Sequence, residues 1–247
     1  METGYEPRFD FPLRNEPPEQ TYLLATVPRS GSTYLSHVLW RTGCLGAPLE
    51  YLNFEPAGPY GYANRSPADQ SRLWHSALRR RVSPNGVFGL KAFPLQLEAL
   101  LQSNPALLRQ VMRQMVPSRA ESRVVYMRRG DRTAHAISYA RALLSGVWRK
   151  EQEHAAMAEP DYSPVAVARA SRLIDEQESA WAAMFAELKL TTLTLSYEDV
   201  VVDPAGAAAE VAAYLGVALN ASAEVAVPMV ERQSQAGARV WAAKHSG

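Results

Sequence analysis

Cysteine is almost missing from this chain: Cys44 is the one cysteine among 247 residues. A single thiol excludes an internal disulfide framework and a cysteine-rich metal site, and it favours a reducing compartment, which we expect to be the cytoplasm. The five histidines are scattered and form no cluster with ligand spacing, so no metal site is predicted. The chemistry of the chain must therefore come from other residue types.

Neither charge nor hydrophobicity dominates the sequence. The formal net charge is only +1, so no overall attraction to nucleic acid or to acidic membranes is expected. No apolar run approaches the roughly 18 residues that suggest a membrane span, so we expect no transmembrane segment. Residues 1–20 are polar and proline-rich, unlike a signal peptide. With 47% hydrophobic and 21% charged residues, the composition is typical of a globular protein.

Short apolar runs alternate with helical patterns along the chain. We predict strands and helices in this order: strand 21–27, helix 33–41, helix 69–82, strand 87–92, helix 94–102, helix 105–115, strand 123–127, helix 131–147, helix 165–188, strand 192–195 and helix 204–215. Residues 42–67 are predicted to form a long irregular segment, and the tail 228–247 to be a polar helix. The alternation predicts one α/β domain over residues 21–247, behind an N-terminal arm of residues 1–20, with a central, mostly parallel sheet flanked by helices.

The turn after the first predicted strand is the most informative segment. It reads Pro28-Arg29-Ser30-Gly31-Ser32-Thr33 and leads directly into a helical pattern. The first amide groups of such a helix have no partner within the helix, and the helix dipole adds positive charge, so they bind anions, often phosphate. Arg29 adds a charge, and Ser30, Ser32 and Thr33 add hydroxyl groups. An ordinary helix cap fits the same residues, but the buried strand before them favours a ligand site.

This turn differs from a Walker A loop, which requires GxxxxGK[ST]. It contains one glycine, and no lysine precedes Ser32-Thr33. The sequence therefore favours a binder of another phosphate or sulfate ester over a nucleoside-triphosphate hydrolase. Two alternatives stay open: a small-molecule kinase with an atypical phosphate loop, and a catalytically inactive nucleotide-binding protein.

Four further residues are candidates for binding or catalysis. Arg129 follows the third predicted strand, and Ser138 lies nine residues further on, where its hydroxyl can reach the same anion. Glu50 lies in the apolar and aromatic segment 46–52 and is a candidate general base. Lys91 ends the second strand and can neutralise charge on a transferred group. The simpler interpretations are a surface arginine, a solvated loop glutamate and a lysine whose ammonium reaches solvent.

Taken in order, these segments resemble the bacterial trehalose 2-sulfotransferase family and, more loosely, sulfotransferases that use 3′-phosphoadenosine 5′-phosphosulfate (PAPS). Residues 29–33 are similar to the loop that binds the 5′-phosphosulfate. Residues 43–50 resemble a Gly-x-x-Gly-x-Pro-x-Glu stretch whose glutamate is the catalytic base, and residues 86–91 resemble a second-strand motif that ends in lysine. The similar segments run in the family's order from residue 22 to residue 233.

This resemblance implies a P-loop-like sulfotransferase fold, PAPS as the sulfuryl donor and 3′-phosphoadenosine 5′-phosphate (PAP) as the product. The catalytic residues would be Glu50, Lys91 and Arg29. The nucleotide would be bound by Arg29, Ser30, Gly31, Ser32, Thr33, Tyr34, Arg129, Ser138, Tyr197, Arg232 and Gln233. The implied acceptor is a hydroxyl group of a carbohydrate, a glycolipid or a secondary metabolite, and the implied assembly is a homodimer. Ala47 stands where the trehalose enzymes carry a second glutamate.

Overall fold

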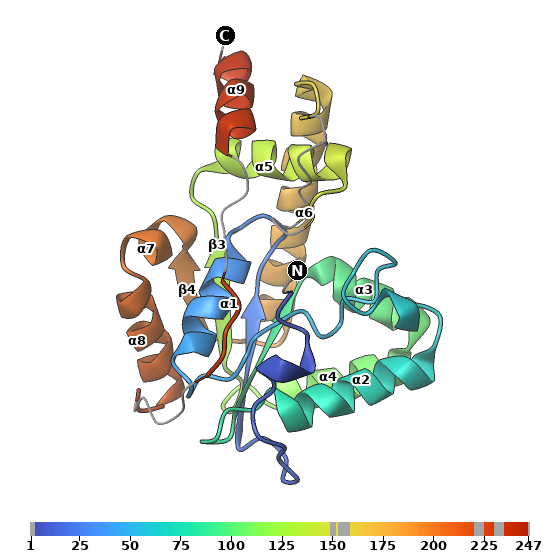
Figure 1. The fold of residues 1–247 in the computed structure, drawn as a ribbon, viewed down its shortest axis with the longest axis vertical. Helices are drawn as coiled ribbons and strands as arrows, with labels where there is room; N and C mark the ends of the chain where they lie inside the picture. Colours follow the sequence, from blue (N-terminus) through green and yellow to red (C-terminus); the bar gives the residue numbers. More distant parts are fainter. Residues whose placement is uncertain (1–2, 149–151, 153–158, 220–224, 230–234, 247) are drawn as a thin grey trace.

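The computed structural model describes residues 3–148, 152, 159–219, 225–229 and 235–246 (Figure 1). Its described strands form one parallel sheet in the order β2-β1-β3-β4. The strands are β1 (Gln20–Ala25), β2 (Val87–Ala92), β3 (Val124–Arg128) and β4 (Thr192–Ser196). The predicted α/β class with a parallel central sheet is therefore confirmed.

The position of β1 determines where the strand order of the sheet reverses. β1 pairs with β2 from Gln20↔Val87 to Ala25↔Ala92, and with β3 from Leu23↔Val124. The chain leaves β1 for β2 on one side and later returns to add β3 and β4 on the other side. The strand order thus reverses between β1 and β3, and ligands of open parallel sheets bind beyond the carboxyl ends of the strands at such a point.

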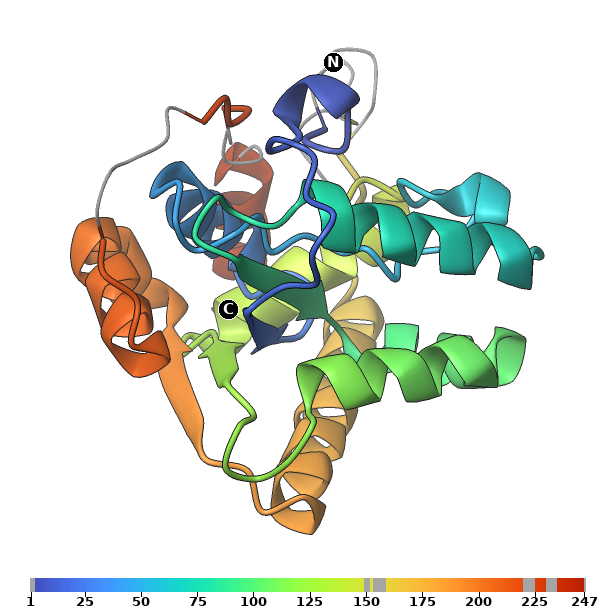
Figure 2. The ribbon, with the colours of Figure 1, turned by 90° about the horizontal axis from the view of Figure 1, so that it is seen from below.

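Helices cover both faces of the sheet (Figures 1 and 2). One face is covered by α1 (Ser32–Arg41), α7 (Tyr197–Val202) and α8 (Pro204–Leu215). The other face is covered by α2 (Pro67–Arg80), α3 (Pro94–Ser103), α4 (Pro105–Met115) and α6 (Pro164–Glu187). Alternate side chains of β1 pack into the two cores: Tyr22 and Leu24 into the first, Leu23 and Ala25 into the second.

A third layer lies beyond the carboxyl ends of the strands. It contains α5 (Arg132–Ser145) and α9 (Gln235–Ser246), and α5 packs on both α6 and α9. Trp241 of α9 is buried, and its indole N–H donates to the carbonyl oxygen of Pro160. Figure 1 shows these helices above the sheet, on the side where the turns after β1 and β3 lie.

The N-terminal arm is packed against the rest of the protein. It contains the short 3-10 helix η1 (Pro7–Phe9). The side chains of Phe9 and Phe11 are buried in the second core, the one that contains Leu23 and Ala25 of β1. The irregular segment after α1 contains a second 3-10 helix, η2 (Gly61–Ala63). The N-terminal arm and the segment after α1 contain little regular secondary structure, yet both contribute buried aromatic side chains to that core.

Helix starts follow local cap signals in the sequence. Side-chain oxygens accept backbone N–H groups at these caps: Ser66, Asn104, Asp131, Ser163, Ser196 and Asp203. The structure differs from the prediction at three helices. α2 begins at Pro67 because Ser66 caps it, α7 was not predicted, and residues 225–229 are not helical, so that α9 is shorter than the predicted tail helix.

Candidate functional site

The turn between β1 and α1 has an unusual backbone. Gly31 is the residue before the first helical turn and has φ +87°, in the left-handed region where glycine is favoured. Arg29 has φ +67°, which is uncommon for a residue with a side chain and is typical of functional turns. These two residues turn the chain sharply, so that the first amides of α1 lie at the carboxyl edge of the sheet.

The carbonyl groups before this turn are held from the core side. The Trp181 indole N–H donates to the Thr26 carbonyl at 2.7 Å, and His135 Nε2 lies 2.8 Å from the Pro28 carbonyl oxygen. His135 must therefore carry its proton on Nε2. In a trans peptide the N–H points opposite to the C=O, so the amide of Arg29 points away from His135. The helices α5 and α6 thus fix which way the turn presents its donors.

A buried lysine links the turn to the predicted base. Lys91 Nζ lies 3.0 Å from Thr33 Oγ1 and 3.0 Å from Glu50 Oε1, and its side chain is only 2% exposed. Thr33 belongs to the first turn of α1, Lys91 to β2, and Glu50 to the loop after α1. The structure therefore brings together three residues that the sequence analysis singled out separately.

The Glu50 carboxylate is fixed at both oxygens. Its Oε1 faces Lys91, while its Oε2 accepts hydrogen bonds from Asn53 Nδ2 at 2.9 Å and Gln96 Nε2 at 3.0 Å. The backbone N–H of Glu50 donates to the Tyr5 hydroxyl at 3.1 Å. The side chain is 16% exposed, so the carboxylate is held in a fixed direction while it still reaches the surface.

A second group of residues lies on the α5 side of the turn. Arg29 Nε donates to Ser138 Oγ at 3.1 Å, and its guanidinium also donates to the carbonyl oxygen of Trp148. The sequence predicted that Ser138 and Arg129 bind the same anion, and the structure adds a direct contact of Ser138 with Arg29. The guanidinium fork and the hydroxyl are thus oriented together at the edge of the turn.

A third group lies on the β4 side. The ring of Tyr197 packs against Gly31 so closely that a Cβ atom there would lie 2.1 Å from Tyr197 Cδ2. The Arg129 guanidinium carbon lies 5.0 Å from the centre of the same ring, within cation–π range. Arg129 Nε is buried and has no hydrogen-bond partner among the described residues. A buried donor of this kind is expected to meet an acceptor from a ligand.

Glu198 holds the turn that carries Arg129. Its two carboxylate oxygens accept the backbone N–H groups of Gly130 at 2.9 Å and Asp131 at 3.1 Å. Partial burial by itself raises the pKa of this carboxyl, but the two amides and the Arg129 charge outweigh it and lower the pKa. Glu198 is therefore ionised at neutral pH and clamps the turn after β3.

The remaining predicted residues differ in what they can offer. Ser30 is fully buried and its hydroxyl lies 2.6 Å from Thr26 Oγ1, so its side chain supports the turn from within. Ser32 is buried at the start of α1. Tyr34 is half-buried and packs against the first core, the one that contains Tyr22 and Leu24 of β1. Arg232 and Gln233 lie outside the described residues.

Sequence reasoning missed several residues that surround the site. Tyr5, Asn53, Gln96 and Glu198 all hold predicted site residues in place. Gln96 had a usable signal, because it is three residues after Phe93 and its side-chain oxygen accepts the Phe93 N–H, as in a capping box. The other contacts join segments that are distant in sequence or lie in irregular loops, where no periodic pattern indicates them.

The site carries more positive than negative charge. Arg29, Arg129 and Lys91 face it, against the carboxylates of Glu50 and Glu198. Together with the amides of the turn, this arrangement suits an anionic ligand, and the Glu50 carboxylate lies beside it. No group of three metal-binding side chains comes together within the described residues. In the same ranges, no helix combines the length and apolarity needed for a bilayer span.

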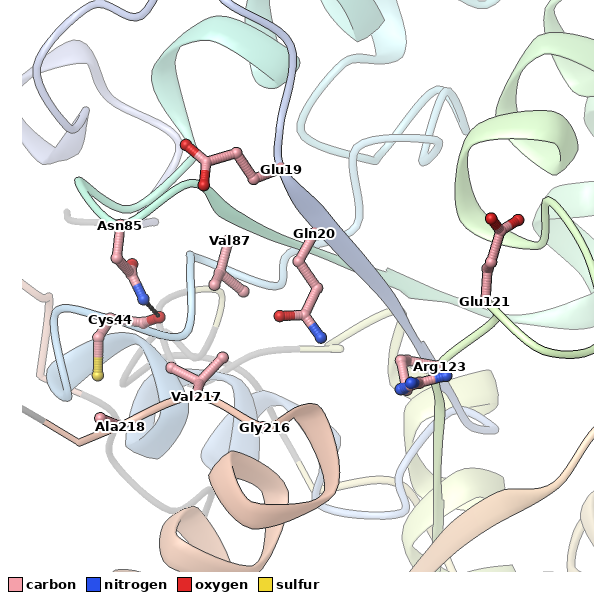
Figure 3. Close-up of a pocket in the computed structure, with 10 residues that line it drawn as sticks. All are labelled: Glu19, Gln20, Cys44, Asn85, Val87, Glu121, Arg123, Gly216, Val217 and Ala218. Carbon is pink, nitrogen blue, oxygen red and sulfur yellow. Dashed lines mark hydrogen bonds between the residues drawn. The ribbon is translucent and has the colours of Figure 1, made fainter.

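A separate hollow opens at the other end of the sheet (Figure 3). It has a volume of about 750 Å³ and is lined by residues near the amino ends of the strands, among them Gln20, Val87 and Arg123. The Gln20 side chain already donates to the Leu215 carbonyl, and Asn85 donates to the Cys44 carbonyl. None of its lining residues is a predicted site residue, so this hollow does not change the assignment of the site.

Comparison with known proteins gives consistent matches. The family described as Stf0 sulphotransferase matches residues 21–246. The trehalose 2-sulfotransferase of Mycobacterium tuberculosis (strain ATCC 35801 / TMC 107 / Erdman) is 28% identical, over 71% of this chain and 76% of that protein. The enzyme of the same name from Mycolicibacterium smegmatis (strain ATCC 700084 / mc(2)155) is 25% identical over the same shares.

Solved structures give a weaker match. Retinol dehydratase in complex with androsterone and the inactive cofactor PAP is 17% identical, with a TM-score of 0.39. The match covers 81% of this chain and 61% of that chain, so the present chain spans about three fifths of its length. A second retinol dehydratase structure, with retinol and PAP, has a TM-score of 0.37 at 18% identity, over 96% of this chain and 66% of that chain.

Proposed function

The chain belongs to the Stf0 sulphotransferase family, and we propose that it transfers a sulfuryl group from PAPS to a hydroxyl group of a small-molecule acceptor. One observation carries this proposal: Lys91 Nζ bridges Thr33 of the anion-binding turn and the Glu50 carboxylate, at 3.0 Å from each. An anion site, a cation and a candidate base therefore meet at a single point, which is what transfer of a charged group to a hydroxyl requires.

The residues around the turn fit a nucleotide that carries two phosphate groups. The amides of residues 31–33 and the Arg29 side chain suit the 5′-phosphosulfate. Arg129 and Ser138 are proposed to bind the 3′-phosphate, which distinguishes PAPS from ATP. The buried, unpartnered Nε of Arg129 supports this role, as does the Tyr197 ring, which lies against both Arg129 and Gly31 and suits a base or ribose.

The protein's part in the reaction is positioning and charge neutralisation. PAPS supplies an activated sulfuryl group, which forms a bond to the acceptor oxygen as its bond to the 5′-phosphate breaks. Glu50 accepts the proton of the attacking hydroxyl group. Lys91 and Arg29 neutralise the charge on the oxygens around the sulfur, while Asn53 and Gln96 hold Glu50 in the orientation that the proton transfer requires.

The acceptor is proposed to be a hydroxyl group of a carbohydrate, a glycolipid or a secondary metabolite. The two curated relatives, both named trehalose 2-sulfotransferases, support the carbohydrate class. Ala47 is fully buried, so it offers no polar contact at the position of the second glutamate in those enzymes. We therefore propose an acceptor panel of trehalose, glucose, a bacterial glycolipid extract and a metabolite extract, tested with ³⁵S-labelled PAPS.

We also propose an oligomeric state and a location in the cell. The proposal of a homodimer rests on the family resemblance, and light scattering of the purified protein measures the oligomeric state directly. A cytoplasmic location rests on the single cysteine, Cys44, which is buried and free.

The donor is tested by heat protection. A ligand that binds only the folded state raises the melting temperature, and at a fixed concentration the rise grows with the logarithm of its affinity. We expect PAP to protect the protein and ATP with Mg²⁺ to protect it much less, because Arg129 and Ser138 would meet the 3′-phosphate. Protection by ATP with Mg²⁺ alone would favour the kinase alternative.

The base is tested by Glu50→Gln, which keeps the hydrogen-bonding shape but removes the proton acceptor. We expect sulfuryl transfer to fall roughly 10² to 10⁴-fold while the affinity for PAP, measured by calorimetry, stays within a factor of about three. Glu55→Gln is the matched control, because Glu55 lies in the same loop and is exposed. Near wild-type transfer in Glu50→Gln would remove Glu50 as the base.

A further inference from the structure

The N-terminal arm contacts the loop that carries the proposed base. Tyr5 lies in this arm, outside residues 21–246 that the family matches. Its hydroxyl accepts a hydrogen bond from the backbone N–H of Glu50, with an N···O distance of 3.1 Å. A residue outside the matched region therefore fixes the main chain of a residue at the centre of the proposed reaction.

The arm is firmly anchored, so this contact has a defined geometry. Arg81, at the end of α2, is only 3% exposed, and its guanidinium donates to the carbonyl oxygens of Gly4 at 2.8 Å and Glu6 at 3.3 Å. It also forms an ion pair with Asp10 at 3.0 Å. A buried guanidinium is strongly destabilised when its partners are removed, so the arm segment around Tyr5 is held in place.

Neighbouring aromatic side chains also fix the orientation of the Tyr5 ring. It makes edge-to-face contacts with Tyr60, at a centroid distance of 5.3 Å, and with Tyr51, at 6.5 Å. Tyr51 is the residue after Glu50, and Tyr60 precedes η2 in the irregular segment. These contacts aim the phenol so that its oxygen meets the Glu50 amide.

We propose that Tyr5 is a positioning residue for Glu50, a role that rests on the proposed function. Lys91, Asn53 and Gln96 fix the carboxylate end of Glu50, and Tyr5 fixes its main-chain end. General-base catalysis depends on the distance and direction between the base and the attacking hydroxyl, and small displacements lower the rate steeply. The arm is thus a working part of the acceptor side of the site in this chain.

Tyr5→Phe tests this role, because it removes the hydroxyl and keeps the ring contacts. We expect kcat for PAP release from PAPS to fall about 10-fold, with the Kd for PAP and the KM for PAPS unchanged. This kcat is measured with the acceptor of the panel above that gives the fastest transfer. If the protein sulfates none of those acceptors, the release of PAP is measured with water as the acceptor. The Glu50 amide, followed by NMR hydrogen exchange, should exchange faster than in the wild type.

Tyr214→Phe is a matched control, because it removes a contact of the same kind. The Val124 N–H donates to the Tyr214 hydroxyl at 3.1 Å, at the amino end of β3. This variant should lose stability, measured as melting temperature, and keep the wild-type kcat. The proposal is overturned if Tyr5→Phe keeps the wild-type kcat or Glu50 amide exchange, or if Tyr214→Phe loses as much activity.

The two proposals fail in different ways. If the proposed function is wrong, the wild-type protein moves no sulfate to any acceptor, whether or not it binds PAP. If only the role of Tyr5 is wrong, the wild-type protein binds PAP and Glu50→Gln loses activity, while Tyr5→Phe behaves like the wild type.

Discussion

Lys91 is a charged residue in a strand whose residues are all buried. Burying an ammonium group is costly, and the Glu50 carboxylate offsets that cost only in part, so a buried ion pair is weak support for stability. Apolar residues could fill the same volume at similar or better stability. The pair is therefore best explained by chemistry at the end of β2, where both groups lie beside the turn that we propose binds the anion.

Gly31 combines a left-handed backbone with close contact to Tyr197, and both favour glycine. In Gly31→Ala, the new Cβ would lie 2.1 Å from Tyr197 Cδ2, so the ring and the turn must move apart. We expect the affinity for PAP to fall at least about 10-fold, because the amides of the turn and Arg129 on the Tyr197 ring both shift. Isothermal titration calorimetry with PAP measures the change.

Gly216→Ala separates backbone strain from the contact with Tyr197. Gly216 has φ +69°, and nothing lies within 4 Å of its added Cβ. This variant should lose about 1 kcal/mol of stability and keep the wild-type affinity for PAP. Equal affinities for PAP in the wild type and Gly31→Ala would contradict the assigned role of the turn.

At the scale of elements, α7 joins two of the loops that build the site. It is a short helix, Tyr197–Val202, that starts at the carboxyl end of β4. Its first residue packs on Gly31, and its second, Glu198, clamps the turn after β3. One short helix thus sets the positions of the loops after β1 and β3 relative to each other.

Glu198→Gln weakens this link while it keeps the side-chain shape. The amide has one oxygen, so it can no longer accept both N–H groups, and the charge that balances Arg129 is lost. We expect the affinity for PAP to fall about 5 to 10-fold and that for adenosine 5′-monophosphate to stay unchanged, because the latter has no 3′-phosphate. Parallel titrations measure both affinities, with the exposed Glu210→Gln as control. An equal loss for both nucleotides would disprove the link to the 3′-phosphate.

The elements themselves could largely be predicted from the sequence. The predicted strands occur close to their expected bounds, because buried parallel strands are short apolar runs between turn signals. α7 was missed although Ser196 and Asp199 have the spacing of a cap, since six residues are too few for a helical period. The strand order depends on packing across the whole chain, and no local pattern indicates it.

The site was predictable in part, for a related reason. The turn residues 29–33, Glu50, Lys91 and Arg129 stand directly after strands or in motifs, where side chains meet at the carboxyl edge. Tyr5 and Asn53 lie in irregular segments, and their contacts with Glu50 arise only when those segments fold onto the core. The roles of the predicted residues in binding and catalysis stay predictions until the variants are measured.

For the molecule as a whole, two buried histidines make stability depend on pH. Burial is the main cause that lowers the pKa of His37 and of His135 to about 4, although each also hydrogen-bonds to a carbonyl group. The unfolded chain binds protons at these residues below about pH 6.5, and the folded protein does so only near pH 4. The folded state therefore loses stability as the pH falls through this window.

Each histidine should contribute about 2 kcal/mol to the loss between pH 7 and pH 5. Urea unfolding at the two pH values measures the total, and NMR titration of the ring protons gives each pKa. The expected result is a steep fall in the free energy of unfolding. If one of these histidines titrates near pH 6.5 in the folded protein, it does not contribute to the loss of the free energy of unfolding.

The arm that carries Tyr5 also bears on how the protein is best handled. The first described residues lie near the carboxyl ends of the strands, while α9 ends far from them (Figure 1). An affinity tag or reporter domain fused in front of residue 3 would lie close to Tyr5, whose hydroxyl contacts the backbone N–H of Glu50. The same fusion placed after α9 would project away from the sheet, and so would leave turnover measurements undisturbed.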